Sequence, residues 1–351
     1  MKTGMGFSAV VGMAAIVCVV LGGTAHAEKT TGEGKYRFRL KYTSDHLPEA
    51  AQEVLVNAHG GFAVDQREGK GEVYFALPGA GIIQISGDLS KTRMIDTTKE
   101  VAATNLHNTM IWYPKGSEPY LAFPGNGVAK VFTTTLDGKL VHTLNSPTTA
   151  DDLEPPSVRE YFEKDGKFVP TDVEQLDGLY YVATGYSPLD YVLTAKIKLE
   201  PFDATWNSLA FGGKGNEPGQ FGTGHGVTVP PGKKRIDIAD RPNSEIDRFT
   251  PEGKYLETVS LPKGSLPCDT FYQDDLLIVG CLKGPDKEKG APIYILKDDE
   301  LVSTLMPKED LGLEKFTHVH NAICVVRDKK IYVIAQAWNP GDFSILEQVT
   351  D

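Results

Sequence analysis

The chain has 351 residues, and its 36 basic side chains against 47 acidic ones give a formal charge of −11 at pH 7. No lysine- or arginine-rich stripe interrupts this acidic balance, so nucleic acid and anionic membrane surfaces are excluded as expected partners. The length fits one toroidal β domain.

Residues 1–27 have the pattern of a secretory signal peptide. Lys2 precedes an apolar run from Phe7 to Gly23, and Ala25-His26-Ala27 fits an A-x-A cleavage site. The run is short for a spanning helix, although a signal anchor is the alternative. We therefore expect a secreted or periplasmic mature chain, residues 28–351, that forms a single domain without membrane insertion after cleavage.

Six copies of one pattern follow, each a short apolar strand, a turn and a second β-rich strand. The first strands begin at His59, His107, Pro170, His225, Pro267 and His320. The second strands begin at Glu72, Pro119, Leu179, Ile236, Leu276 and Lys330. Their spacing, roughly 45 to 60 residues, is typical of propeller blades. The sequence therefore predicts an all-β fold, a six-bladed β-propeller with four-stranded antiparallel blades.

Two segments lie outside the repeats. Tyr36-Arg-Phe-Arg-Leu-Lys-Tyr42 is predicted to be a leading strand that either closes the ring or covers one face. The stretch 146–168 is predicted to be a long ordered loop with one helical turn.

Three histidines occupy the same place in their blades, at the entry of the innermost strand of blades two, four and six: His107, His225 and His320. Alternate blades of a six-bladed ring are about 120° apart, so these side chains should converge on the central axis. Three neutral imidazoles with an open fourth position suit Zn²⁺ or another divalent transition metal. The alternative for each histidine taken singly is a capping or packing role. His59 and His318 are expected to be structural or to line the funnel.

Blades three and five place Thr171-Asp172 and Cys268-Asp269 at the equivalent position. Their carboxylates could orient the imidazoles. We expect them instead to bond to exposed backbone amides.

Cys268, Cys281 and Cys324 remain in the mature chain. Cys268 and Cys281 lie nearly opposite each other in a predicted hairpin, so a cross-strand disulfide and two reduced thiols are both open. Cys324 lies in an apolar strand and is predicted to be a buried small hydrophobic residue.

Several motifs resemble a known family. Pro218-Gly-Gln-Phe221, Ala239-Asp-Arg-Pro-Asn243 and Ile246-Asp-Arg-Phe249 are similar to the NHL repeat. Blades two to six resemble the lyase domain of peptidylglycine amidating enzymes, the peptidyl-hydroxyglycine (peptidylamidoglycolate) lyases. Tyr181-Val-Ala-Thr-Gly-Tyr186 is similar to the segment of that family that carries its catalytic tyrosine.

The resemblance implies roles for five residues. His107, His225 and His320 fall where the family has its zinc ligands, while Tyr186 and Arg241 match its catalytic tyrosine and active-site arginine. In such a site the metal polarises a substrate oxygen. Tyr186 acts as base, with a pKa lowered by the cation and by Arg241, and C–N cleavage releases an amide and an oxo acid. Without the resemblance, Tyr186 is a strand-end tyrosine and Arg241 an ion-pair partner for neighbouring acids.

The chain also departs from the family. The substrate-binding arginine of the first blade would fall near Leu77, where no arginine occurs, and the aspartate that helps to hold a structural calcium is Asn321 here. A structural calcium is therefore doubtful. The expected substrate is a small hydroxylated or carboxylated molecule rather than an amidated-peptide precursor.

Two other functional classes stay open. One is a non-catalytic propeller whose face binds a protein or a glycan, since fold alone does not decide function. The other is a metal-dependent lactonase or hydrolase, which would present carboxylates to a hard cation. No heptads or large apolar edges occur in the sequence, so we expect a monomer.

Overall fold

The computed structural model describes residues 1, 3–4, 28–147 and 153–350. The predicted signal peptide falls almost wholly outside these residues and stays a prediction. Within the described part of the chain, no helix is both long enough and apolar enough to cross a membrane.

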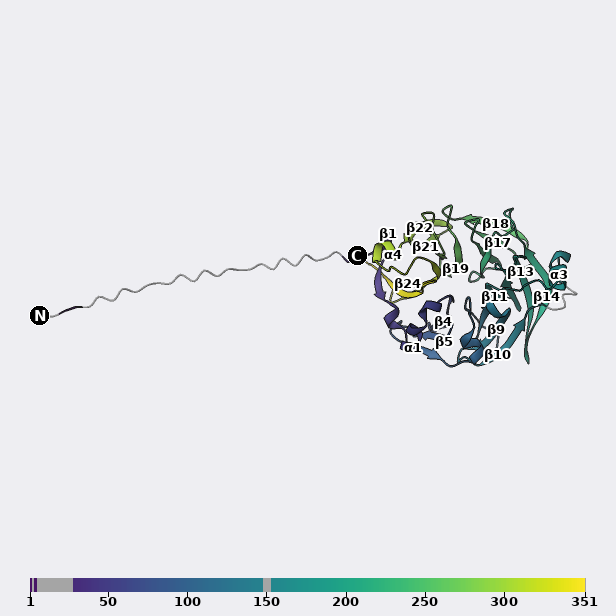
Figure 1. Cartoon of the computed structure of the whole chain (residues 1–351), viewed down its shortest axis with the longest axis horizontal. Coiled ribbons are helices and arrows are strands. Elements are labelled where there is room, and N and C mark those ends of the chain that lie inside the picture. The colour runs from purple at the N-terminus through teal and green to yellow at the C-terminus, as the bar shows by residue number, and fades with distance from the viewer. Residues whose placement is uncertain (2, 5–27, 148–152, 351) are drawn as a thin grey trace.

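Six antiparallel sheets surround a central axis (Figure 1), which confirms the predicted six-bladed propeller. Blade one contains β3 (Phe62–Val64), β4 (Val73–Leu77), β5 (Gly81–Ile85) and β6 (Thr92–Ile95). Blade two contains β7 (Met110–Trp112), β8 (Tyr120–Gly125), β9 (Lys130–Thr135) and β10 (Leu140–Asn145). Blade three contains β11 (Asp172–Leu176), β12 (Leu179–Ala183), β13 (Tyr191–Leu199) and β14 (Phe202–Gly212).

The remaining blades follow the same order from the axis outward. Blade four contains β15 (Gly224–Thr228), β16 (Ile236–Asp240), β17 (Glu245–Phe249) and β18 (Tyr255–Ser260). Blade five contains β19 (Pro267–Gln273), β20 (Leu276–Cys281), β21 (Ile293–Lys297) and β22 (Glu300–Leu305). Blade six contains β23 (Val319–Arg327), β24 (Lys330–Ala337) and β25 (Asp342–Gln348).

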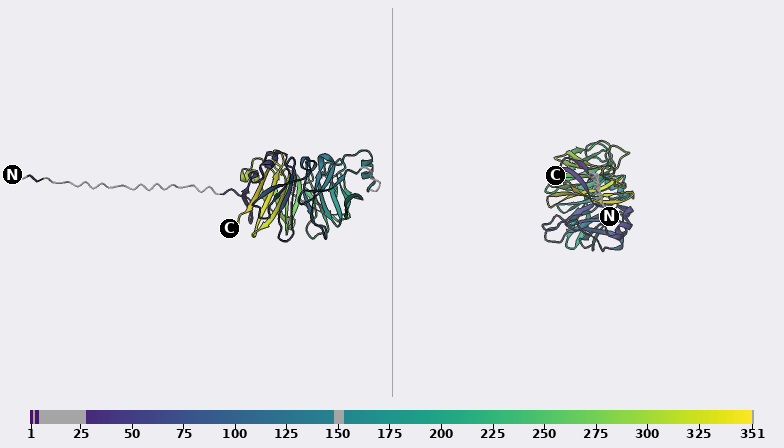
Figure 2. Two further views of the ribbon diagram at one scale, coloured as in Figure 1. Left: turned by 90° about the horizontal axis from the view of Figure 1, so that it is seen from below. Right: turned by 90° about the vertical axis from the view of Figure 1, so that its left-hand side faces the viewer.

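The N-terminal strands close the ring. β1 (Thr31–Glu33) pairs with β2 (Tyr36–Tyr42), and β2 pairs antiparallel with β25, with Phe38 opposite Gln348 and Leu40 opposite Leu346. This resolves the two alternatives for the leading strand in favour of closure. Figure 2 shows the resulting ring from its edge, with early and late strands side by side in blade six.

The apolar core lies between blades. Each blade is covered on both faces by its neighbours, so an inner strand such as β4 is buried along its whole length instead of alternating. Between blades one and six, Phe75 and Phe343 stack with ring centroids 5.8 Å apart. Such contacts give the blades fixed positions, and the inner strand ends are fixed with them.

Short helices lie in the connections. They are α1 (Glu49–Glu53), α2 (Lys99–Ala103), α3 (Pro156–Glu163) and α4 (Pro307–Leu311), with 3-10 turns at Ser44–His46, Leu55–Asn57 and Asn126–Val128. Helix α3 is the predicted turn of helix in the loop at 146–168. It lies at the outer edge of the ring beside β14 (Figure 1).

The three cysteines in the described part of the chain, Cys268, Cys281 and Cys324, are reduced and buried. Pro267 lies opposite Cys281 and Asp269 opposite Gly280, so a register shift at Cys268 takes it out of direct pairing with Cys281. Of the two alternatives left open by the sequence, the structure has the two thiols rather than a disulfide. Cys324 is fully buried in β23, as predicted.

Candidate metal centre

Three histidine side chains at the start of the innermost strands contact one another. His107, His225 and His320 are 0%, 2% and 2% exposed. Their ring centroids are separated by 4.6 Å for His107 and His225, 4.6 Å for His107 and His320, and 5.0 Å for His225 and His320. A tetrahedral ion with Zn–N bonds of about 2.0 Å holds its imidazole centres about 5 Å apart. The ring centres therefore lie close to the spacing of imidazoles that share one ion.

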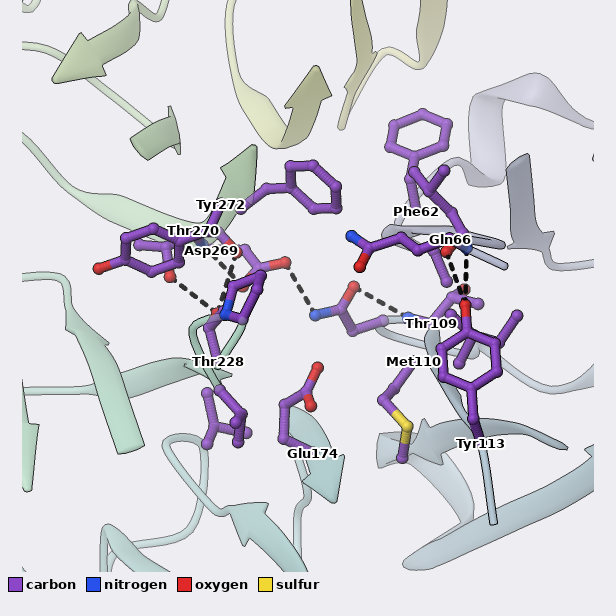
Figure 3. A pocket seen from close by; sticks show the side chains of 18 residues that line it. Phe62, Gln66, Thr109, Met110, Tyr113, Glu174, Thr228, Asp269, Thr270 and Tyr272 are labelled. Atoms are coloured by element: carbon purple, nitrogen blue, oxygen red, sulfur yellow. Dashed lines mark hydrogen bonds between the residues drawn. The ribbon is translucent and has the colours of Figure 1, made fainter. Parts of the chain in front are cut away.

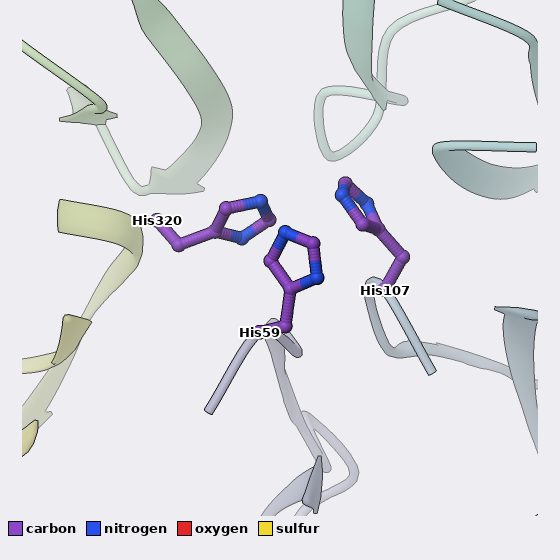
Figure 4. Close-up of side chains that lie close together, drawn as sticks. All are labelled: His59, His107 and His320. Carbon is purple, nitrogen blue, oxygen red and sulfur yellow. The ribbon is translucent and has the colours of Figure 1, made fainter. Parts of the chain in front are cut away.

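Two further side chains join this cluster. His59 lies 4.3 Å from His107 and 4.4 Å from His320 between ring centroids, and Figure 4 shows the three rings turned toward one another. Possible ligand atoms lie within 4.8 Å of one another in two groups that share His320. These groups are His59, His107 and His320, and His225, Cys268 and His320. The predicted three thus belong to a cluster of four imidazoles and one thiol. Within it, His107 and His225 fall in different groups, and His320 is common to both.

Hydrogen bonds from neighbouring blades fix two of the rings. Nδ1–H of His107 donates to the carbonyl oxygen of Thr171 at 2.6 Å, and Nδ1–H of His225 donates to that of Cys268 at 2.6 Å. Each bond leaves Nε2 unprotonated, which is the form that binds a metal. Nε2 of His107 has no partner, whereas Nε2 of His225 accepts from the Tyr186 hydroxyl. The orienting groups are therefore backbone carbonyls of blades three and five, rather than the carboxylates of those blades.

Buried lone pairs without partners test whether a cation fits here. Among the described residues, Nε2 of His107 and both ring nitrogens of His320 are buried and have no hydrogen-bonding partner. Such orphaned nitrogens are costly to bury unless a ligand satisfies them. The donor set of imidazoles and one thiol suits a borderline transition metal such as Zn²⁺.

Burial keeps the imidazoles neutral. It lowers the pKa of His107, His225 and His320 well below the usual 6.5, and the positive charge of Arg241 acts in the same direction. Burial lowers the pKa of His59 to about 4. All four rings are therefore neutral at pH 7, and each offers one lone pair beside its single N–H.

Tyr186 and Arg241 lie directly beside this cluster. The Tyr186 hydroxyl donates to Nε2 of His225 at 3.1 Å and accepts from Nη1 of Arg241 at 2.7 Å. Arg241 is 7% exposed, and its Nη2 donates to the sulfur of Cys268 at 3.0 Å. Arg241 is thus a buried part of the site and does not pair with neighbouring acids.

The pKa of Tyr186 is raised, not lowered. Burial of the hydroxyl is the largest cause, and the positive charge of Arg241 opposes it without cancelling it. The predicted lowering of this pKa by the cation and Arg241 together is therefore not produced by Arg241 on its own. A base role for Tyr186 requires additional positive charge close to its oxygen.

A polar layer lies next to the imidazoles along the chain. Oδ1 of Asp172 accepts from the amide of Val173 at 2.7 Å, and Oδ1 of Asp269 accepts from the amide of Thr270 at 2.7 Å. Asp269 also accepts from the side-chain amides of Asn108, at 3.0 Å, and of Asn321. The expected bonding of these carboxylates to backbone amides is thus present.

This layer borders a cavity of about 180 Å³. Figure 3 shows the carboxyl groups of Asp269 and Glu174 turned into it. Burial raises the pKa of Glu174 well above its usual value and that of Asp269 to about 6. The ring therefore carries nitrogen and sulfur ligands at one level and oxygen ligands at the next.

Other predicted positions lie apart from the cluster. His318 bonds through Nδ1 to the carbonyl oxygen of Asn339 at 3.0 Å and packs on Trp338, with ring centroids 5.6 Å apart. Leu77, where the resemblance to the peptidylamidoglycolate lyases would place an arginine, is 1% exposed and belongs to the apolar core of blade one.

The sequence missed His59 and Cys268 as members of the cluster, although the signal was available. The six equivalent strand entries are His59, His107, Thr171, His225, Cys268 and His320. The prediction took the residues of every second blade. Because the axis is narrow, residues at the start of neighbouring blades also contact one another.

Comparisons with known proteins show a similarity of fold. No family model and no curated protein matches the chain. A streptogramin B lyase structure is similar at 13% identity and TM-score 0.51, covering 90% of this chain and 99% of that one.

Two virginiamycin B lyase structures from Staphylococcus aureus each cover 84% of this chain and 96% of theirs. A catalytically inactive variant with quinupristin has 13% identity and TM-score 0.47, and a selenomethionine-substituted form has 11% and 0.46. At 13% identity the likeness to the streptogramin B lyase structure shows a shared fold alone.

Proposed function

We propose that this chain is a secreted or periplasmic metal-dependent lyase that cleaves a C–N or C–O bond in a small hydroxylated substrate. The observation that carries the proposal is the set of buried, neutral imidazole nitrogens beside the hydroxyl of Tyr186. The lyases among the proteins of similar fold agree with it without establishing it.

His107, His225 and His320 would hold zinc or another divalent transition metal. A bound ion of this kind supplies Lewis acidity toward a substrate oxygen and positive charge near Tyr186. Nε2 of His225 cannot both ligate an ion and accept from Tyr186. If His225 ligated an ion, the Tyr186 hydroxyl would no longer donate to it and would be available to the substrate. Nη1 of Arg241 would still donate to the Tyr186 oxygen, at 2.7 Å in this structure.

In the proposed reaction Tyr186, ionised, takes the proton of the substrate hydroxyl. The electron pair of that O–H bond forms the new C=O bond as the neighbouring C–N bond breaks, and the leaving nitrogen takes up a proton. Arg241 would stabilise the negative charge on the phenolate oxygen until Tyr186 takes up the proton. Cys268 positions Arg241 by accepting from Nη2.

The test uses zinc-loaded protein and α-hydroxyglycine compounds, with glyoxylate release as readout. Tyr186→Phe should lower turnover by about 10²- to 10⁴-fold and leave zinc content unchanged. Tyr161→Phe on helix α3, which removes a hydroxyl at the outer edge of the ring, should leave turnover unchanged. Turnover without zinc, or full turnover in Tyr186→Phe, would contradict the proposal.

A second candidate rests on the oxygen-rich layer. Asp172, Glu174 and Asp269 provide carboxylates of the kind that a lactonase or hydrolase presents to a hard cation. Activity supported by calcium alone, and lost in Asp269→Asn but not in His225→Ala, would favour this candidate. Protein that retains neither metal would instead favour a propeller that binds a protein or a glycan.

A further inference from the structure

A second pocket adjoins the imidazole cluster at His59. It has a volume of about 590 Å³ and lies between blades six, one and two. We call it the Trp338 pocket and define it by Asn57, His59, Pro78, Asn105, Trp338 and Asn339. His59 belongs to both, since its ring touches His107 and His320 and also lines the pocket. Among the described residues of the cluster, His59 is the one that also lines this pocket, so the two spaces adjoin at His59.

Trp338 gives the pocket a fixed flat wall. Its indole packs on His59 with ring centroids 5.5 Å apart and an interplanar angle of 26°. Its backbone N–H donates to the carbonyl of His318 at 2.9 Å. A rigid aromatic face of this kind favours planar groups, which stack on it at little conformational cost.

The polar groups of the pocket are neutral amides. Asn105 bonds to Nδ1 of His59 at 2.9 Å and donates to Oδ1 of Asn126 at 3.1 Å. Asn57 donates to the carbonyl of Pro78 at 3.4 Å, and both Asn57 and Asn339 are exposed. An amide side chain offers one acceptor and two donors, so it complements another amide.

The described residues that line the Trp338 pocket are uncharged at neutral pH. Among the described residues that line the pocket there is no Asp, Glu, Lys or Arg. A carboxylate placed here would give up hydration without gaining a cationic partner. An uncharged amide would lose less on entry and can replace its water contacts with those of asparagine.

We propose that the Trp338 pocket binds a planar, uncharged, carboxamide-bearing part of the substrate, an inference that rests on the proposed lyase function. The pocket thereby selects against substrates with a carboxylate at this position. The reacting bond stays at the imidazole cluster, and the pocket acts in binding and selectivity.

The test keeps the zinc-binding head constant and varies the group that reaches the pocket. The probes are 4-carbamoylbenzohydroxamic acid and 4-carboxybenzohydroxamic acid, titrated into zinc-loaded protein by calorimetry, with acetohydroxamic acid as the head alone. The carboxamide should bind at least about 10-fold more tightly than the carboxylate. Equal affinity, or tighter binding of the carboxylate, would overturn the proposal.

Two variants at the pocket sharpen the result. Trp338→Ala should weaken both aromatic probes by about 3- to 10-fold and leave acetohydroxamic acid unchanged. Ala103, exposed at the end of α2, also lines the pocket. Ala103→Arg should strengthen the carboxylate probe selectively, whereas Ala103→Gln, of similar length without charge, should not. Equal loss of all three probes in Trp338→Ala would contradict the assignment.

A measurement without metal separates this inference from the proposed function. Benzamide and benzoate are titrated into the metal-free chain while the indole N–H resonance assigned to Trp338 is followed by NMR. Benzamide should shift that resonance and benzoate should not. If zinc fails to bind but this preference holds, only the lyase proposal falls. If zinc binds and benzoate shifts the resonance as much as benzamide, only the pocket inference falls.

Discussion

Gly226→Ala tests whether the carbonyl of Cys268 sets the metal affinity of His225. A Cβ atom at position 226 would lie 2.6 Å from that carbonyl oxygen and 2.8 Å from Cα of Asp269. Both contacts are closer than folded proteins tolerate, and both neighbours are backbone, so the strand must move. The carbonyl that accepts from Nδ1 of His225 at 2.6 Å moves with it.

The size of the effect follows from two contributions. Overpacking of this kind costs about 1–3 kcal/mol of stability. Displacing the hydrogen-bond partner of a ligating histidine weakens metal affinity by about 10- to 100-fold. Because the blade cores do not depend on this position, the metal-free variant should still fold.

The assay is competition for zinc between the protein and a chromophoric chelator, alongside urea unfolding of the metal-free form. Gly127→Ala is the matched control, since its added Cβ would meet nothing within 4 Å. It should bind zinc as the parent does. If Gly226→Ala folds and keeps the parent's zinc affinity, the backbone carbonyl of Cys268 does not orient His225 for metal binding.

Three further predictions follow from the site. In the native chain His59 has a pKa of about 4, whereas in the unfolded chain it has the ordinary value of 6.5. Between these two pH values, protonation of His59 therefore favours the unfolded chain. Metal-free protein should therefore lose roughly 3 kcal/mol from this group between pH 6.5 and 4, as measured by urea unfolding, and His59→Gln should reduce that loss. Arg241→Met should raise the pKa of Tyr186 further, since it removes the charge that opposes burial; an unchanged tyrosinate titration by ultraviolet absorbance would contradict the contact. Thiol titration of denatured, unreduced protein should find Cys268 and Cys281 both reactive, whereas a disulfide would leave both unreactive.

Much of the architecture could be predicted because its cause is local. Turn residues and apolar strands repeat six times, and a blade that cannot cover its own faces requires neighbours. The strand Tyr36–Tyr42 was recognised with the correct bounds. Whether it closed the ring depended on pairing with β25, some 300 residues away, and no local pattern encodes such a partner.

The site was predictable as a set of positions, but not as a set of contacts. Equal register on blades two, four and six brought His107, His225 and His320 to the axis. How near His59 approaches depends on the width of the ring, which is fixed by packing between blades. The contact of Arg241 with Cys268 was also missed, because a strand bulge at Cys268 decides where that sulfur lies.

The orienting groups of the histidines show another limit. The sequence identifies side chains, but every residue has a backbone carbonyl. Only the folded structure shows that the carbonyl oxygens of Thr171 and Cys268 accept from His107 and His225. The direction of the Tyr186 pKa depends in the same way on burial that exceeds the effect of its charged neighbour.

X-ray absorption of zinc-loaded protein measures which atoms bind the metal in the proposed centre. We predict one zinc per chain, with three imidazole nitrogens at about 2.0 Å from the metal, and loss of that zinc in folded His225→Ala. Absence of bound zinc, or a first shell containing a thiolate sulfur at about 2.3 Å, would contradict a centre built from His107, His225 and His320.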